Sequence, residues 1–229
     1  MQLARVFRIF VGLATIAGLA VQYFLQVADS PRGLVDATVQ YFSYFTILGN
    51  LVGVAVMLAP AIAPTSLVGR FSLRPDVRTA TTLYLLQIGF VYHMILTAQL
   101  APASGLGLFS DYIIHTLVPV AFAIDWILLV DKRGLTLRMT PSWIVFPAVY
   151  GAYVLIRGAL TGVYPYWFLQ VDKLGAVTVT RNFILLLAAF LIGGAGLVFL
   201  GRAFDARFRN STPGKVSSVL RSLFGRSRS

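Results

Sequence analysis

The chain has 229 residues, of which 58% are hydrophobic and 12% are charged, and its mean hydropathy is +0.80. It has too few polar side chains to cover a water-soluble surface, so the composition excludes an ordinary soluble domain. The formal net charge is +11, but the basic residues lie in short segments between long apolar runs, as membrane topology predicts, and we expect no nucleic-acid partner. The absence of Cys excludes disulfides and thiolate metal sites.

Six apolar segments are each long enough to cross about 30 Å of hydrocarbon as a helix. In chain order they are Val6–Ala28, Thr38–Ala59, Arg78–Leu100, Phe109–Val130, Ser142–Thr161 and Asn182–Phe204. The first follows two arginines, as a signal peptide would, but its length and the lack of a small-residue cleavage site predict a retained span. The expected fold is therefore all-α: a polytopic membrane protein with a six-helix transmembrane bundle and short loops.

The distribution of Lys and Arg predicts how this bundle is oriented. If the N-terminus lies in the cytoplasm, only Arg32, Lys173 and Arg181 fall on the opposite side. Arg157 falls inside the fifth span, and every other basic residue lies on the cytoplasmic side. This asymmetry follows the positive-inside rule. We therefore expect an integral protein of the cell (plasma) membrane with both termini in the cytoplasm.

The domain organisation follows from the spans. Residues 1–204 are expected to form the transmembrane domain, and residues 205–229 a basic cytoplasmic tail. Within the tail, Lys215–Phe224 has apolar residues on one helical face, which is typical of an interfacial amphipathic helix. A disordered basic tail is the alternative.

Polar and ionisable side chains within the spans are candidates for function, because a charge near the bilayer centre costs at least about 2.5 kcal/mol. They are Thr46 and Asn50 in the second span, His93 in the third, His115 and Asp125 in the fourth, and Arg157 in the fifth. The helical rise places Thr46 about 12 Å, His93 about 10 Å, His115 about 9 Å and Arg157 about 6 Å from the outer ends of their spans. We expect these four residues to line one cavity that opens toward the outer leaflet.

Three of the polar residues have the chemistry needed for acyl transfer. Asp111 lies four residues before His115, so a helix stacks them and the carboxylate is able to orient the imidazole. The histidine base would then activate the hydroxyl of Thr46 as a nucleophile. Pro119 lacks the amide that would bond to the His115 carbonyl, so it bends the span beside the histidine. Alternatively, Thr46 bonds back to a helix carbonyl and the histidines serve only in packing.

We expect neither a metal nor a cofactor. His93, His115 and Asp111 form a thin ligand set without an HExxH motif or a carboxylate cluster. The Gly105–Gly107 segment lacks the strand and helix that a phosphate-binding loop requires.

Two further charged residues have their own interpretations. Asp125 lies near the cytoplasmic end of its span, and we expect it to pair with a nearby Arg or to reach the interface. Arg157 either pairs in the same way near the outer headgroups, or binds a lipid carboxylate or phosphate, or stabilises an oxyanion.

Three stretches together form a pattern: Tyr44–Asn50, then Asp111–Thr116 with Pro119 and Asp125, and then Arg157 with Tyr164–Leu169 and Gly175. This pattern resembles prokaryotic six-span integral membrane proteins, which are similar to the eukaryotic androgen-induced membrane hydrolases. The resemblance implies a membrane-embedded threonine nucleophile and a histidine that hydrolyse fatty-acid esters of hydroxy fatty acids, and these match Thr46 and His115. Two positions depart from the pattern: Asp111 replaces the Asn of the eukaryotic members, and Trp167 replaces a Pro favoured in prokaryotic relatives.

The resulting hypothesis is a membrane-embedded hydrolase of lipid or acyl esters, with Thr46 as nucleophile and His115 as base. The supporting residues are expected to be Asp111, Asn50, His93 and Arg157. The expected partners are membrane lipids or an acyl-ester substrate, and the question of protein partners stays open. Two alternatives stay open: a small transporter or proton-coupled carrier that uses the ionisable residues, and a lipid-binding membrane protein without catalysis.

Overall fold

The structure is a computed structural model that describes residues 2–99 and 105–210. Within these residues, six helical segments are long and apolar enough to cross a membrane: Gln2–Ala28, Phe45–Ile62, Pro75–Leu96, Gly105–Leu129, Leu137–Thr161 and Ala176–Asp205. The described residues contain no strand. The expectation of an all-helical bundle with six such segments is therefore confirmed. The predicted amphipathic helix at Lys215–Phe224 lies outside the described residues.

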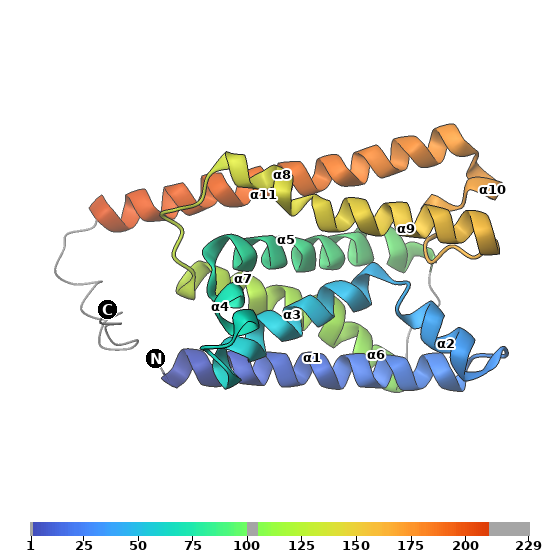
Figure 1. The fold of residues 1–229 in the computed structure, drawn as a ribbon, viewed down its shortest axis with the longest axis horizontal. Coiled ribbons are helices and arrows are strands. Elements are labelled where there is room, and N and C mark those ends of the chain that lie inside the picture. Colours follow the sequence, from blue (N-terminus) through green and yellow to red (C-terminus); the bar gives the residue numbers. More distant parts are fainter. Residues whose placement is uncertain (1, 100–104, 211–229) are drawn as a thin grey trace.

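Eleven α-helices follow one another along the described chain (Figure 1). They are α1 (Gln2–Ala28), α2 (Gly33–Tyr41), α3 (Phe45–Ile62), α4 (Leu67–Leu73), α5 (Pro75–Val91), α6 (Gly105–Tyr112), α7 (Val118–Leu129), α8 (Thr140–Trp143), α9 (Val145–Thr161), α10 (Val171–Leu174) and α11 (Ala176–Asn210). Two π-helical segments interrupt the regular geometry: η1 (Tyr92–Leu96) continues α5, and η3 (Ile113–Leu117) joins α6 to α7. Short 3-10 turns lie at η2 (Thr97–Gln99), η4 (Leu137–Met139) and η5 (Trp167–Leu169).

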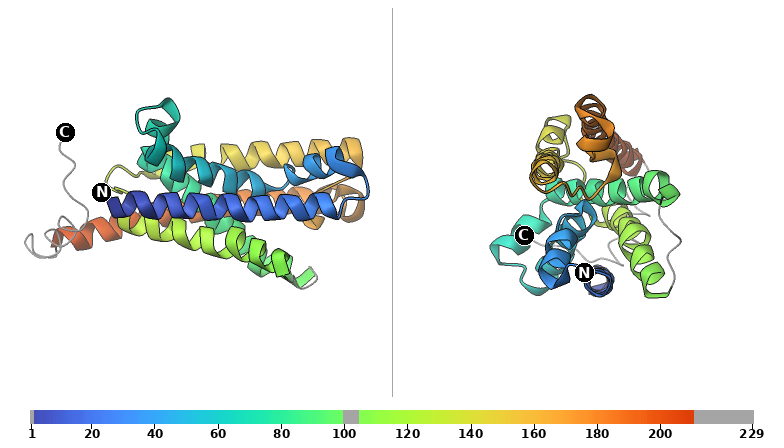
Figure 2. Two further views of the ribbon diagram at one scale, coloured as in Figure 1. Left: turned by 90° about the horizontal axis from the view of Figure 1, so that it is seen from below. Right: turned by 90° about the vertical axis from the view of Figure 1, so that its right-hand side faces the viewer.

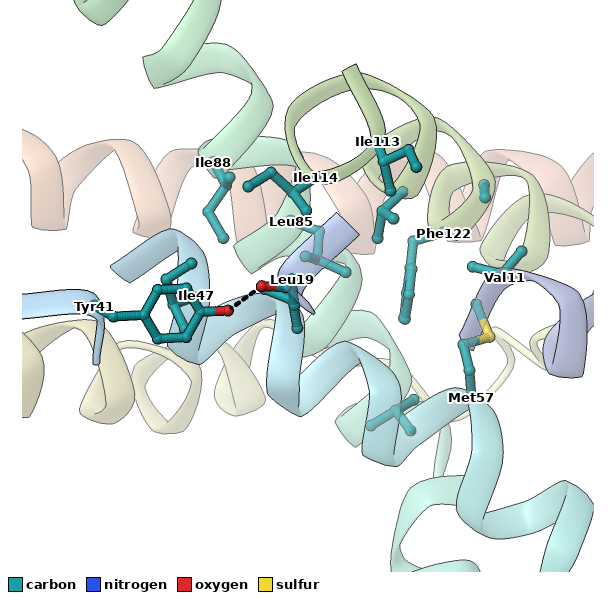
Figure 3. Close-up of a cluster of buried hydrophobic side chains, with 13 residues drawn as sticks. Val11, Leu19, Tyr41, Ile47, Met57, Leu85, Ile88, Ile113, Ile114 and Phe122 are labelled. Carbon is teal, nitrogen blue, oxygen red and sulfur yellow. Dashed lines mark hydrogen bonds between the residues drawn. The ribbon is translucent and has the colours of Figure 1, made fainter. Parts of the chain in front are cut away.

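Helix α5 lies at the centre of the bundle. Every residue from Arg78 to Leu85 is buried, and a helix buried on all sides is a core helix. Helices α1, α3, α6 and α7 lie on one side of it, and α8, α9 and α11 lie on the other (Figures 1 and 2). The core on the first side is apolar, and within it the Tyr41 hydroxyl donates to the Leu19 carbonyl at 2.7 Å (Figure 3). This bond fastens α2 to α1.

The second span begins at Phe45, not at Thr38 as its composition suggests. Helix α2 ends at Tyr41, and Tyr44 has an extended backbone with φ −87° and ψ 133°. The Ser43 hydroxyl bonds back to the Val39 carbonyl at 2.6 Å and also meets the Tyr153 hydroxyl at 2.9 Å, so side chains replace the missing helical bonds at the break. Thr46 consequently lies in the first turn of α3, which corrects its predicted position eight residues into a span. The other boundaries differ less; the last span, for example, begins at Ala176 and not at Asn182.

The outer surface of the bundle is apolar. Val177 is 87% exposed, Leu160 is 80% exposed and Ile192 is 72% exposed, and all three lie on span-forming helices. Exposure of so many large apolar side chains would be unfavourable in water and suits hydrocarbon. The N-terminal end of α1 and the C-terminal end of α11 lie at the same end of the bundle (Figure 1).

Candidate active site

Thr46 occupies the N-terminal turn of α3, where the first amides have no partners within the helix. The Phe45 amide donates to the hydroxyls of Tyr150 and Tyr166, at 3.1 Å each. The Tyr166 hydroxyl also bonds to the side chain and main chain of Thr46. Burial raises the pKa of Tyr166, although its hydrogen bonds to Thr46 and Phe45 partly oppose this, so the hydroxyl keeps its proton at neutral pH. Thr46 thus lies beside a protonated phenol hydroxyl and near the positive end of a helix dipole.

Thr46 also lines a pocket between α3, α5, α9, α11 and η5, whose empty space is about 620 Å³ when the open space at its mouth is included. The polar side chains of the lining are Thr46, Gln87, Tyr150 and Tyr166, and the remaining walls are aliphatic or aromatic carbon. The pocket therefore has mostly apolar walls with a few hydroxyl groups, as does a site for an amphipathic ligand.

His115 lies in the π-helical segment η3, packed against η1. Its ring stacks on Tyr92 with ring centres 3.7 Å apart and an angle of 7° between the planes. The Nδ1 atom is 3.7 Å from Asp111 Oδ1, which is longer than a hydrogen bond, and it is buried without a hydrogen-bond partner. The Tyr92 hydroxyl bonds to the Asp111 carboxylate. Tyr92 therefore contacts both the imidazole and the carboxylate that was expected to orient it.

The two π-helical segments are joined by a second contact. His93 Nε2 lies 3.0 Å from Thr116 Oγ1, so each histidine of the chain contacts the opposite segment. Pro119 lies in the first turn of α7, two residues after η3, and supplies no amide to the His115 carbonyl, so the helix is interrupted beside the histidine. Beside that carbonyl lies Gly89, where an added Cβ would come within 2.9 Å of the His115 oxygen. Close approach of α5 to His115 thus depends on a residue without a side chain.

Asn50 connects the turn that holds Thr46 to the segment that holds His115. Its Nδ2 atom donates to the Thr46 carbonyl at 2.8 Å and to the Ile114 carbonyl at 3.3 Å. Asn50 is fully buried, and its Oδ1 atom has no hydrogen-bond partner. A buried amide with a free acceptor is costly, so this position is a candidate for function and not only for packing.

The four residues expected in one layer do not share the pocket. Only Thr46 lines it, and no hydrogen bond of the described residues joins Thr46 to His115. The reason is the geometry of α5: Gln87 and Val91 face the pocket, whereas Gly89 and Tyr92 lie on the face that contacts His115. The expectation of a single cavity is corrected accordingly.

Arg157 has structural partners. Its guanidinium donates to the Val163 carbonyl at 2.7 Å and to Gln40 Oε1 at 2.9 Å. These bonds hold the loop after α9 against α2. Gln40 in turn donates to the Tyr44 hydroxyl at 3.2 Å. Arg157 is therefore linked through Gln40 to the residue that precedes α3.

Asp125 lies in a buried ionic cluster toward the other end of the bundle. It accepts from Arg8 Nε at 2.8 Å and from Arg78 at 2.5 Å, which confirms the expected pairing with arginine. Both partners belong to other spans, so the cluster ties α1, α5 and α7 together.

Comparison with protein-family models, with curated proteins and with solved structures found no match to this chain. Among the described residues, no three His, Cys, Asp or Glu side chains gather as a metal site would require. The local geometry of this chain is therefore the basis for assigning a function.

Sequence reasoning missed three tyrosines of the site. Tyr92 and Tyr150 lie within helices and gave no signal, because a tyrosine in a span is ordinarily a packing residue. Tyr166 belongs to the aromatic run Tyr164–Phe168, which is typical of an interfacial belt. Only the fold shows that its hydroxyl turns inward to the start of α3.

Proposed function

We propose that this protein is a membrane-embedded hydrolase of lipid or acyl esters, with Thr46 as its nucleophile and His115 as its base. The observation that supports this best is the position of the Thr46 hydroxyl. It lies in the first turn of a helix, beside the Tyr166 hydroxyl, in the wall of a mostly apolar pocket. An acyl chain in that pocket would present its ester carbonyl to Thr46.

The reaction has two steps. Thr46 Oγ attacks the ester carbonyl carbon while its proton passes to His115, and the tetrahedral oxyanion is stabilised by the Tyr166 hydroxyl and the helix dipole of α3. The C–O bond to the alcohol breaks, and the departing oxygen takes the proton from His115. Water then attacks the acyl-threonine with His115 again as base, which releases the carboxylic acid and restores Thr46.

His115 must come within hydrogen-bonding distance of Thr46 for this reaction. Catalytic hydrogen bonds are often long in ligand-free enzymes and tighten in the substrate complex. Asn50 bonds to both segments, so it is placed to couple their movement. Asp111 and Tyr92 would orient the imidazole, and His93 would hold η3 through Thr116.

The proposal includes a topology. Most basic residues of the described chain lie in segments at the end of the bundle opposite Thr46: the start of α1, the segment from α4 to the start of α5, the segment between α7 and α8, and the end of α11. The positive-inside rule therefore favours cytoplasmic termini in a plasma membrane. Thr46 then lies in the outer half of the membrane, where lipid ester groups of the outer leaflet are near. The resemblance of Tyr44–Asn50 and Asp111–Thr116 to the threonine hydrolases supports the same chemistry.

Labelling with a fluorescent fluorophosphonate, which traps activated hydroxyl nucleophiles, tests the proposal. The wild type should be labelled, Thr46→Ser should retain labelling, and Thr46→Ala should lose it. His115→Ala should lower the labelling rate by about 100-fold or more, as expected for loss of a general base. Thr161→Ala, which removes an exposed threonine hydroxyl at the end of α9, is the matched control. Undiminished labelling of a folded Thr46→Ala variant would refute the assignment.

A lipid-binding protein without catalysis is the second candidate. The lack of a hydrogen bond between Thr46 and His115 favours it. In that case lipid would co-purify with the protein, but neither the wild type nor any variant would react with the fluorophosphonate.

A further inference from the structure

A second hollow adjoins the pocket that holds Thr46. It lies between α5 and α11, and we call it the α5–α11 groove. Its empty space is about 820 Å³ when the open space at its mouth is included. The groove and the pocket share Gln87, Val91, Phe168, Leu186 and Phe190 as lining residues. The two hollows therefore lie side by side, separated only by side chains that line both of them.

The groove opens on the lipid-facing side of the bundle. Phe90 on α5 is 57% exposed and Leu185 on α11 is 60% exposed, and both line it. Both belong to helical segments long enough to span a membrane. Hydrocarbon chains, not water, are therefore the medium outside the groove.

The amide nitrogens of the two amide side chains that line the groove already have partners. Gln87 Nε2 donates to the Ala189 carbonyl at 2.8 Å, which bridges α5 and α11. Asn182 Nδ2 donates to the Phe168 carbonyl at 2.9 Å. A polar solute would find few free hydrogen-bonding groups in this groove, whereas an alkyl chain needs none.

We propose that one acyl chain of a membrane lipid enters sideways between α5 and α11, lies in the groove, and extends into the pocket with its ester end toward Thr46. The position of the ester rests on the proposed hydrolase function. The entry of the acyl chain does not rest on that function, because it depends only on the adjacency and apolar lining of the two hollows and on movement of the side chains that they share.

Photo-crosslinking of the full chain in phosphatidylcholine vesicles tests the entry. The probe is a phosphatidylcholine whose acyl chain has a diazirine and an alkyne, and the crosslinked peptides are identified by mass spectrometry. Leu169 lines the pocket and is only 2% exposed, so a crosslink there requires a chain inside the protein. Phe24 on α1 is 62% exposed to lipid and serves as the internal reference.

Ala189→Trp fills the groove, and Ile192→Trp places the same bulk on an exposed position of α11 that does not line it. We expect Ala189→Trp to lower the ratio of Leu169 to Phe24 crosslinks by about tenfold, and Ile192→Trp to leave it unchanged. If Ala189→Trp does not fold, Leu185→Trp blocks the same groove. Crosslinks confined to exposed positions, or an equal ratio in the blocked variant and its control, would overturn the proposal.

Crosslinking and fluorophosphonate labelling of the wild type, compared with each other, separate the two proposals. Crosslinking at Leu169 without fluorophosphonate labelling of the wild type would leave the entry route standing and remove the hydrolase. Labelling of the wild type with no crosslink at Leu169 would support the hydrolase and overturn the entry route.

Discussion

Tyr166 and Tyr150 both accept a hydrogen bond from the Phe45 amide, but only Tyr166 also bonds to Thr46. Tyr166→Phe should therefore leave the start of α3 capped by Tyr150. It should also remove the hydroxyl that is proposed to stabilise the tetrahedral oxyanion. We expect a folded protein whose labelling rate falls by about 100-fold. Tyr23→Phe is the control, since the Tyr23 hydroxyl meets Thr38 away from the pocket. Equal labelling of the two variants would show that Tyr166 has no part in the reaction.

Gly89 provides a second test at the scale of one residue. A Cβ there would lie 2.9 Å from the His115 carbonyl, so Gly89→Ala should displace η3 and cost about 1–3 kcal/mol of stability. Gly196→Ala is the matched control, because its Cβ would meet nothing within 4 Å. We expect Gly89→Ala to lower both the thermal unfolding temperature in detergent and the labelling rate, and Gly196→Ala to lower neither. A Gly89→Ala variant as stable as the control would mean that α5 tolerates the added methyl group beside His115.

The residues of the site were only partly predictable from the sequence. Thr46, Asn50, His93 and His115 stand out because polar groups are rare in apolar runs. Tyr166 does not, since an aromatic residue near a membrane interface has an ordinary explanation. Whether Thr46 and His115 become neighbours also depends on which face of α5 their helices contact. The hydropathy pattern of the sequence does not specify that face.

At the scale of helices, the Asp125 cluster should contribute most to the packing of the spans. Asp125→Asn leaves Arg8 and Arg78 without their carboxylate, and loss of one partner of a buried ionic group costs about 3–5 kcal/mol. Asp131→Asn breaks an exposed pair with Arg133 and should cost less than about 1 kcal/mol. Thermal unfolding in detergent measures both. Similar unfolding temperatures would show that the cluster does not hold α1, α5 and α7 together.

The spans themselves were predictable because each needs a long apolar run, and such runs are visible in the sequence. The break between α2 and α3 was not, because residues 41–45 read Tyr-Phe-Ser-Tyr-Phe and contain neither Gly nor Pro. The partners of Asp125 were not predictable by name either. They lie 117 and 47 residues away along the chain, and only the fold brings them together.

At the scale of the whole molecule, the orientation in the membrane is open to a direct test. The chain has no Cys, so each substitution introduces a single thiol. Lys173→Cys lies before α11, and Gly134→Cys lies in the loop after α7, at the opposite end of the bundle. A membrane-impermeant maleimide should label Lys173→Cys in intact cells and Gly134→Cys only after lysis. The reverse pattern would place Thr46 in the cytoplasmic half of the membrane.

The attachment site of the fluorophosphonate tests the central claim most directly. The wild-type protein is labelled in detergent or vesicles, digested, and analysed by tandem mass spectrometry to locate the phosphonyl group. We predict one adduct on the Thr46 oxygen, absent in Thr46→Ala and slow to form in His115→Ala. An adduct on another hydroxyl, or no adduct on a protein that is folded and binds lipid, would contradict the assignment of Thr46 as the nucleophile.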